Sequence, residues 1–290
     1  MKVLGVGVAT LDIVNHVSGY PEEDSEVRAT GQRQSLGGNA ANTLTVLNRL
    51  GHQCSWAGTL ADDAASDFVR QQLLSEPVDI DNAEVIERAS LPVSYIMLNT
   101  ENGSRSIVHF RDLPEYRSET FKNIDIDEFD WIHFEGRNVA ELKKMMRYLQ
   151  DNGFHHFSLE IEKPREGIEE LFALPEVLVF SRDYLHQTHK GVKDFFEDLR
   201  ADGVASALYC AWGKAGGWAM DRDGKLYQQP AWKPETVVDT LGAGDAFNAG
   251  IIDAVLNGLA VEQVLVHACK VAGFKCGLQG FDGIGQVREV

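Results

Sequence analysis

Short apolar segments alternate with longer amphipathic segments along most of the chain. The valine-rich run at 2–9 predicts a buried strand, and the alternation becomes regular from Asp130 onward. In that part, strands are predicted at 131–134, 156–161, 177–180, 205–211, 217–220 and 225–229, and helices at 139–151, 166–173, 191–202, after Asp245, and from Val261 to about Gly277. Strands that alternate with helices predict an α/β fold, with a mostly parallel sheet covered by helices on both faces.

Two stretches in the first half of the chain do not follow this alternation. Short, half-exposed strands are predicted at 16–17, 26–28 and 30–35, and a hairpin at 93–98 and 106–110 around the Asn102-Gly103 turn. We interpret them as insertions, at about 13–35 and 92–112, into one domain that spans residues 1–290. The chain shows no internal repeat or linker that would mark a second contiguous domain.

A glycine-rich turn leads into a strongly apolar helix near the C-terminus. Glycines allow a ligand to approach the backbone, and the first turn of a helix presents unpaired amides. Gly242, Ala243 and Gly244 therefore form a candidate site for a phosphate anion. Asp245 lies where that anion would sit, which suits a base that accepts a proton from an attacking hydroxyl group. The alternative is that Asp245 only caps the helix.

A second glycine-rich turn, at 37–38, precedes an amphipathic helix that should stop at Gly51. Asn39 and Asn42 lie three residues apart at its start and can project from one face. An amide side chain both donates and accepts hydrogen bonds, which suits the paired hydroxyl groups of a sugar. The alternative is that Asn39 only caps this helix, which leaves Asn42 without a role.

Several polar residues lie at or just after the predicted strand ends, where α/β sheets bind their ligands. They are Asp12, Glu135, Gly213 and Asp245. Asp12 needs hydrogen-bond partners, which are either backbone groups or the hydroxyl groups of a bound polyol. Arg105, at the start of the return strand of the hairpin, is either a solvated edge charge or a contact to a phosphate. This convergence predicts one shared site.

Composition excludes several classes of protein. A net charge of −17 argues against nucleic-acid binding and against docking on anionic membranes. No segment approaches the ~20 apolar residues that span a bilayer, and Asp12 interrupts the N-terminal apolar run, so we expect a cytoplasmic protein. The four cysteines form no Cys-x-x-Cys pair and give no support to a zinc site. Gly5-x-Gly7 lacks the third glycine of a dinucleotide fingerprint, which argues against an NAD-linked oxidoreductase.

The two turns together carry a family resemblance. Gly37-Gly38-Asn39-Ala40-Ala41-Asn42 near the start and Asp239-Thr240-Leu241-Gly242-Ala243-Gly244-Asp245 near the end resemble the two signatures of the PfkB, or ribokinase-like, carbohydrate kinases. The strings Glu135-Gly136-Arg137-Asn138 and Lys275-Cys276-Gly277-Leu278-Gln279-Gly280-Phe281-Asp282-Gly283 are similar to those of its ketohexose-phosphorylating branch. The resemblance implies a three-layer fold with a small β-sheet lid, called a β-clasp, and transfer of phosphate from ATP to fructose, giving fructose 1-phosphate.

The resemblance also implies roles for single residues. Asp245 would be the catalytic base, and Gly242, Ala243 and Gly244 would form the anion hole. The sugar would be held by Asp12, Gly38, Asn39, Asn42 and Asp245. ATP would contact Arg105, Gly213, Lys214, Ala215, Gly216 and Cys276. Mg²⁺ would act with the phosphates, K⁺ is implied near the loop after Asp239, and two chains would dimerise through the lid.

The chain departs from the family pattern in ways that leave the substrate open. Ser181-Arg182-Asp183-Tyr184 stands where many members have an Asn-x-x-Glu magnesium network, and Lys214 and Arg111 could alter specificity. Arg111, pointing inward, would favour an anionic sugar. The alternatives are therefore a kinase of a 2-keto-3-deoxy sugar acid, of another sugar or of a nucleoside, and a non-catalytic sugar or nucleotide sensor.

Overall fold

The computed structural model describes residues 1–188 and 191–288, and is built around one large sheet. Its strands lie in the order β15 (Leu226–Gln229), β14 (Gly217–Met220), β13 (Ala207–Ala211), β12 (Val177–Ser181), β11 (Phe157–Ile161), β10 (Trp131–Glu135), β1 (Lys2–Val6), β4 (Gln53–Ala57) and β6 (Val78–Asp79). All neighbours are parallel except the β13–β14 and β14–β15 pairs. The predicted, mostly parallel sheet is confirmed.

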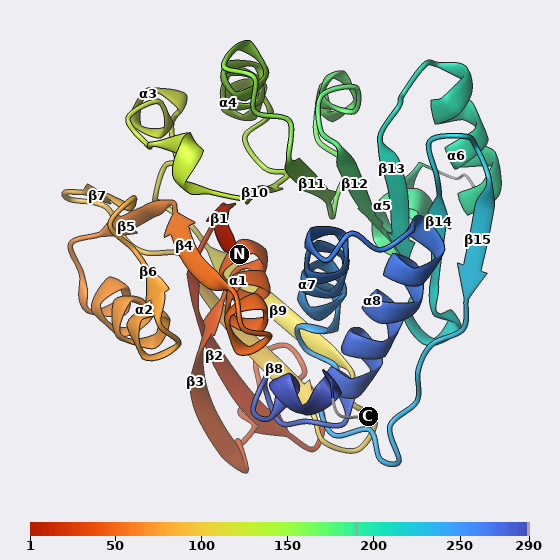
Figure 1. The fold of residues 1–290 in the computed structure, drawn as a ribbon. Helices are drawn as coiled ribbons and strands as arrows, with labels where there is room; N and C mark the ends of the chain where they lie inside the picture. The colour runs from red at the N-terminus through yellow and green to blue at the C-terminus, as the bar shows by residue number, and fades with distance from the viewer. Residues whose placement is uncertain (189–190, 289–290) are drawn as a thin grey trace.

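Helices cover both faces of this sheet and make three layers (Figure 1). One face carries α1 (Asn39–Arg49), α7 (Ala243–Leu256) and α8 (Val261–Cys276), with α2 (Ala64–Ser75) beside them. The other carries α3 (Ser118–Phe121), α4 (Val139–Asp151), α5 (Arg182–Gln187) and α6 (Val192–Ala201). Short 3₁₀ turns lie at Ile126–Glu128, Ile168–Leu171, Gly213–Ala215 and Ile284–Arg288. Each helical layer has its own apolar core against the sheet, one around Leu44 and Phe247 and one around Phe134 and Phe196.

A second sheet of four strands lies at one end of the molecule (Figure 1). Its order is β3 (Gly31–Gly37), β2 (Thr10–Val17), β8 (Val93–Asn99) and β9 (Arg105–Phe110), and β5 (Thr59–Ala61) pairs with β7 (Glu84–Ile86) in a two-stranded ribbon. The four strands come from the two early stretches that broke the helix–strand alternation. That they act as a lid stays a prediction at this point.

Four local expectations are wrong. The helix predicted at 166–173 is only a 3₁₀ turn at Ile168–Leu171. The first strand ends at Val6 instead of continuing to 9, because the chain turns at Gly7, where a Cβ atom would lie 2.6 Å from both Ala40 and the Glu135 carboxylate. Asp12 consequently belongs to β2 of the small sheet and does not end a strand of the large one. Residues 26–28 are exposed and form no strand, since β3 begins only at Gly31.

Candidate active site

A cleft of about 660 Å³ is lined by residues of the small sheet and of the carboxyl edge of the large sheet. Most of the residues that the sequence singled out line it: Asp12, Gly38, Asn39, Asn42, Arg105, Gly213, Asp239, Gly242, Ala243, Gly244 and Asp245. Lys214, Ala215, Gly216 and Cys276 do not. The fold therefore brings residues from both ends of the chain to one cavity. The strand-end prediction is wrong for Glu135, which does not line this cleft, and for Asp12, which reaches it from the small sheet.

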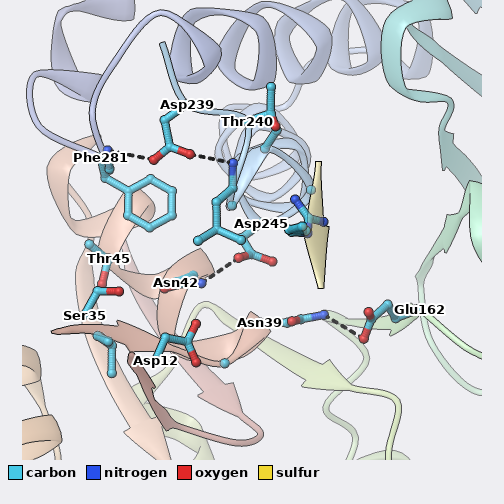
Figure 2. Close-up of a pocket in the computed structure, with 18 of the residues that line it drawn as sticks. Asp12, Ser35, Asn39, Asn42, Thr45, Glu162, Asp239, Thr240, Asp245 and Phe281 are labelled. Carbon is cyan, nitrogen blue, oxygen red and sulfur yellow. Dashed lines mark hydrogen bonds between the residues drawn. The ribbon is translucent and has the colours of Figure 1, made fainter. Parts of the chain in front are cut away.

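Asp245 is the third residue of α7 and does not cap it. The N-cap is Gly242, with a left-handed φ of 81°, and no side chain makes the capping hydrogen bond. The carboxylate is 8 % exposed and accepts a hydrogen bond of 2.7 Å from Nδ2 of Asn42, as Figure 2 shows. Burial raises its pKa to about 7, and the negative charges of Glu135, Glu162 and Asp12 act in the same direction, against the Asn42 bond. A carboxylate with this pKa is suited to accept a proton near neutral pH.

The turn before Asp245 presents backbone to the cleft. Gly242 needs to be glycine, because its φ is positive and a Cβ atom would lie 2.6 Å from the Phe281 ring. A Cβ atom on Gly244 would meet only open space. Since α7 begins at Ala243, the amides of its first turn have no acceptor within the helix, and the positive end of the helix dipole is directed at the cleft.

The two asparagines of α1 bind different carboxylates. Asn39 does not cap the helix; its Nδ2 lies 3.1 Å from each oxygen of Glu160 and 3.4 Å from Glu162 (Figure 2). Asn42 binds Asp245. Gly38 precedes them with φ 102°, and a Cβ atom there would lie 2.0 Å from the carbonyl oxygen of Val8. The tight contact with Val8 fixes the start of α1 against the chain that leads to the small sheet.

Asp12 faces the same cleft from β2. It accepts a 2.9 Å hydrogen bond from the hydroxyl group of Thr10. Burial raises its pKa, while hydrogen bonds from Thr10 and Ser94 and the charges of His109 and Arg33 oppose the rise. Its partners in the structure are therefore side chains of the small sheet.

Sequence reasoning missed two acidic residues of the cleft, Glu160 and Glu162. Glu160 is next to Glu135 in the register of β10 and β11. Burial raises the pKa of Glu160 well above its usual range, and the neighbouring charges of Asp245, Glu135 and Glu162 add to the shift. Glu160 is the one charged residue of β11, whose other residues are apolar apart from Ser158, and this interruption was the available signal in the sequence.

The loop that precedes the anion turn is held by Asp239. Its Oδ1 accepts from the Leu241 amide at 2.9 Å, and its Oδ2 from the Gly280 amide at 3.2 Å. Arg33 and Lys275 pair with Oδ2 at 3.5 and 3.3 Å. Arg33 was not singled out from the sequence, and Lys275 was named only within a string that carries the resemblance and was given no role, because nothing local marks either residue as a neighbour of Asp239.

The predicted nucleotide-site residues are more dispersed. Arg105 is exposed at the start of β9 and lines the cleft with Gly213. Gly216 is buried, and a Cβ atom there would lie 1.9 Å from the Gln229 carbonyl oxygen, so its glycine serves the close approach of β15. Lys214 and Ala215 are exposed and Cys276 is half-buried.

Within residues 1–188 and 191–288, no group of three or more histidine, cysteine, aspartate or glutamate side chains is arranged to hold a metal ion. Across the same described residues, no helix combines the length and apolar character needed to cross a bilayer.

Comparison with known proteins identifies proteins that are similar to this chain. The profile described as pfkB family carbohydrate kinase matches residues 3–282. The chain is 40 % identical to the ketohexokinase of Mus musculus over 98 % of both chains. Its fold is similar to that of the ribokinase of Thermotoga maritima (TM-score 0.81, 18 % identity, 99 % and 97 % covered). It is also similar to the ribokinase of Arabidopsis thaliana complexed with ribose and ATP (TM-score 0.78, 19 % identity, 96 % and 93 % covered). The resemblance predicted from the motifs is confirmed.

Proposed function

The chain belongs to the pfkB family of carbohydrate kinases, and from that premise we propose that it transfers the γ-phosphoryl group of ATP to a primary hydroxyl group of a ketohexose, giving fructose 1-phosphate from fructose. One observation carries the proposed chemistry: a buried carboxylate, Asp245, with a pKa of about 7 in the first turn of a helix. The choice of a ketohexose is supported by the 40 % identity to the mouse ketohexokinase.

Asp245 acts as the general base. The sugar hydroxyl oxygen attacks the γ-phosphorus, its proton passes to the Asp245 carboxylate, and the bond to the β-phosphate oxygen breaks to release ADP. The amides of Gly242, Ala243 and Gly244 stabilise the negative charge on the transferring group. The positive end of the α7 dipole acts in the same direction.

The sugar binds on the α1 side of the base. Asp12, Gly38, Asn39 and Asn42 surround the space in front of Asp245 and offer both donors and acceptors. Asn42 also holds the Asp245 carboxylate at 2.7 Å, so the same side chain orients the base and the sugar. The small sheet, at about 13–35 and 92–112, acts as a lid that excludes water from the reaction.

ATP binds on the other side, where Arg105 and Gly213 line the cleft and Arg105 contacts the phosphates. Lys214, Ala215 and Cys276, which lie beyond the cleft lining, would contact the nucleoside, and the buried Gly216 would shape the segment that carries them. Mg²⁺ neutralises phosphate charge when it is bound. No carboxylate cluster of the described residues is arranged to hold this ion, so water and the phosphate oxygens would supply most of its ligands. A K⁺ ion near this loop would use Oδ1 of Asp239, which accepts only from the Leu241 amide, because Oδ2 already pairs with Arg33 and Lys275.

The outer face of the lid supports a homodimer. Tyr95 and Val108 are register partners, and Phe110 follows on the same face, opposite to the face of Ser94 and Asp12. Their exposed fractions are 49, 63 and 54 %. An apolar patch of this kind favours association with a second copy, and light scattering of the purified protein measures it.

Two contacts argue against an acidic sugar as the substrate. The guanidinium group of Arg111 pairs with Glu115 at 2.8 Å and donates to the Leu113 carbonyl, and Arg111 does not line the cleft. Lys214 is exposed outside the cleft lining. Neither cation is directed at the sugar, so an uncharged ketose fits this cleft better.

The test is release of ADP from ATP and Mg²⁺ across a panel of sugars, with Asp245→Asn as control. The panel holds fructose, other ketoses, ribose, 2-keto-3-deoxy sugar acids and adenosine. Turnover of fructose that disappears in the variant is the expected result. If only another compound of the panel is turned over, that compound is the substrate instead of fructose. If none is turned over, a sensor is favoured.

A further inference from the structure

Lys275 is a fully buried cation that the proposed mechanism does not use. It lies in the last turn of α8 and is 0 % exposed. Its Nζ atom donates a 2.7 Å hydrogen bond to the main-chain carbonyl of Asp239 and lies 3.3 Å from the carboxylate of the same residue. It also lies 5.8 Å from the centre of the Phe281 ring. An ammonium group without water is costly, so this arrangement persists only because Asp239 compensates it.

The partners of Lys275 are the residues that hold the proposed anion hole. The carboxylate of Asp239 binds the Leu241 amide, one residue before the anion-hole glycine Gly242. The ring of Phe281 packs directly against Gly242, where a Cβ atom would lie 2.6 Å from the ring. Lys275 therefore contacts both supports of the turn, although it does not line the cleft itself.

We propose that Lys275 is a positioning residue for phosphoryl transfer, whose buried ammonium group holds the 239–244 turn so that its amides face the transferring group. The inference rests on the proposed kinase function. Amides that stabilise a transition state must be fixed before the reaction, because reorganisation would consume part of their effect. Arg33 pairs with the carboxylate of Asp239 alone, whereas Lys275 binds both its carbonyl and its carboxylate, so Lys275 fixes the path of the turn as well as its attachment to Gly280.

If Lys275 had a purely structural role, its replacement would have a different effect. The replacement would lower the thermal stability, and turnover would fall only as far as the folded fraction falls. A positioning residue lowers kcat in molecules that are fully folded, and it leaves the sugar KM almost unchanged, because Asp12, Asn39 and Asn42 lie on other elements.

The experiment compares Lys275→Met with Lys270→Met, a matched change at a half-buried position of the same helix. The kinase proposal is tested first, by wild-type turnover and its loss in Asp245→Asn, so that failure of either proposal is recognised separately. We expect Lys275→Met to lower kcat by about 10- to 100-fold, as for loss of one oxyanion-hole donor or less, with the sugar KM within threefold. Lys270→Met should keep wild-type kcat. Wild-type kcat in folded Lys275→Met overturns the proposal.

A double-mutant cycle covers the case in which Lys275→Met does not fold because the Asp239 charge is left buried. Asp239→Asn combined with Lys275→Met removes both charges and is better tolerated than the loss of one partner. In the folded double variant we expect kcat to remain at least tenfold below wild type, with the two single effects less than additive where both can be measured. Wild-type kcat in the double variant overturns the proposal, and so does a loss of kcat that equals the loss of folded protein.

Discussion

Helix α7 carries two buried aspartates, Asp245 in its first turn and Asp253 near its end, with opposite surroundings. Asp253 is 3 % exposed and accepts hydrogen bonds of 2.8 Å from His52, His267 and Arg288. Asp245 is 8 % exposed, accepts from Asn42, and otherwise faces other carboxylates.

The pKa values of the two groups move in opposite directions. Burial alone would raise the pKa of Asp253, but the bonds from His267 and His52 outweigh it and hold the pKa well below its usual range. Burial and negative neighbours raise the pKa of Asp245 to about 7. The same residue type on the same helix is thus a stabilising ionic centre at one end and a proton acceptor at the other. Neighbours contributed by distant segments make the difference.

The comparison predicts its largest effect on catalysis at Asp245. Asp245→Asn keeps the shape of the side chain but removes the proton acceptor, so kcat should fall by about 10³-fold or more, while sugar affinity stays within several-fold. Steady-state kinetics and calorimetric sugar titration measure the two quantities. Full activity of the variant would show that Asp245 is not the base and that the two aspartates do not differ in function.

The next effect is on stability at Asp253. Asp253→Asn leaves two histidines and an arginine without their anion and should lower the free energy of unfolding by about 3 kcal/mol, with kcat per folded molecule unchanged. Because the folded-state pKa is lowered, this contribution is present above the unfolded pKa of 3.8 and is lost as the pH falls below it. Urea unfolding at pH 7 and at pH 3 measures both. Asn257→Ala, which removes a weaker donor to the same carboxylate, serves as control; an unchanged midpoint for Asp253→Asn would contradict the stabilising role.

Asn42 donates to the Asp245 carboxylate and is proposed to bind the sugar, so its removal tests how the surroundings of Asp245 set its pKa. Asn42→Ala should raise the sugar KM by about tenfold, the cost of one hydrogen bond to a charged or paired group, and the ATP KM far less. Since the Asn42 bond lowers the pKa of Asp245, the acidic limb of the kcat profile, near pH 7 in the wild type, should move to higher pH. An unchanged sugar KM would take Asn42 out of the sugar site.

The last prediction concerns how the stability contribution of Asp245 changes with pH. Its folded-state pKa is raised, so its contribution to stability is fully present below pH 3.8 and is lost as the pH rises through about 7. Asp245→Asn should therefore be more stable than wild type at pH 8, by at most about 4 kcal/mol at about 1.4 kcal/mol per pKa unit, and should have nearly the wild-type stability at pH 4. This gain has the opposite sign to the loss in Asp253→Asn. A destabilised Asp245→Asn at pH 8 would show that the two aspartates do not differ as described.

The order of elements and the two glycine-rich turns could be predicted from the sequence. Each depends on neighbours along the chain: periodicity sets strand or helix, and positive φ at Gly38 and Gly242 requires glycine. The motif residues Asp12, Asn42 and Asp245 were expected near one site, and they line one cleft. The placement of Asp12 was wrong in detail, because the chain leaves the large sheet at Gly7, where Ala40 and Glu135 approach too closely for a side chain.

The sequence by itself determined which residues could do chemistry, since residue type and local spacing limit what a turn or a helix start can bind. Only the tertiary structure decided the charge states of these residues and the side chains that hold them in place. The charge of Asp245 helps to raise the pKa of Glu160, and Lys275 reaches Asp239 from another helix. These pairings join segments far apart in the chain, and a pKa depends on distances in space and on exclusion of water, which no local pattern contains.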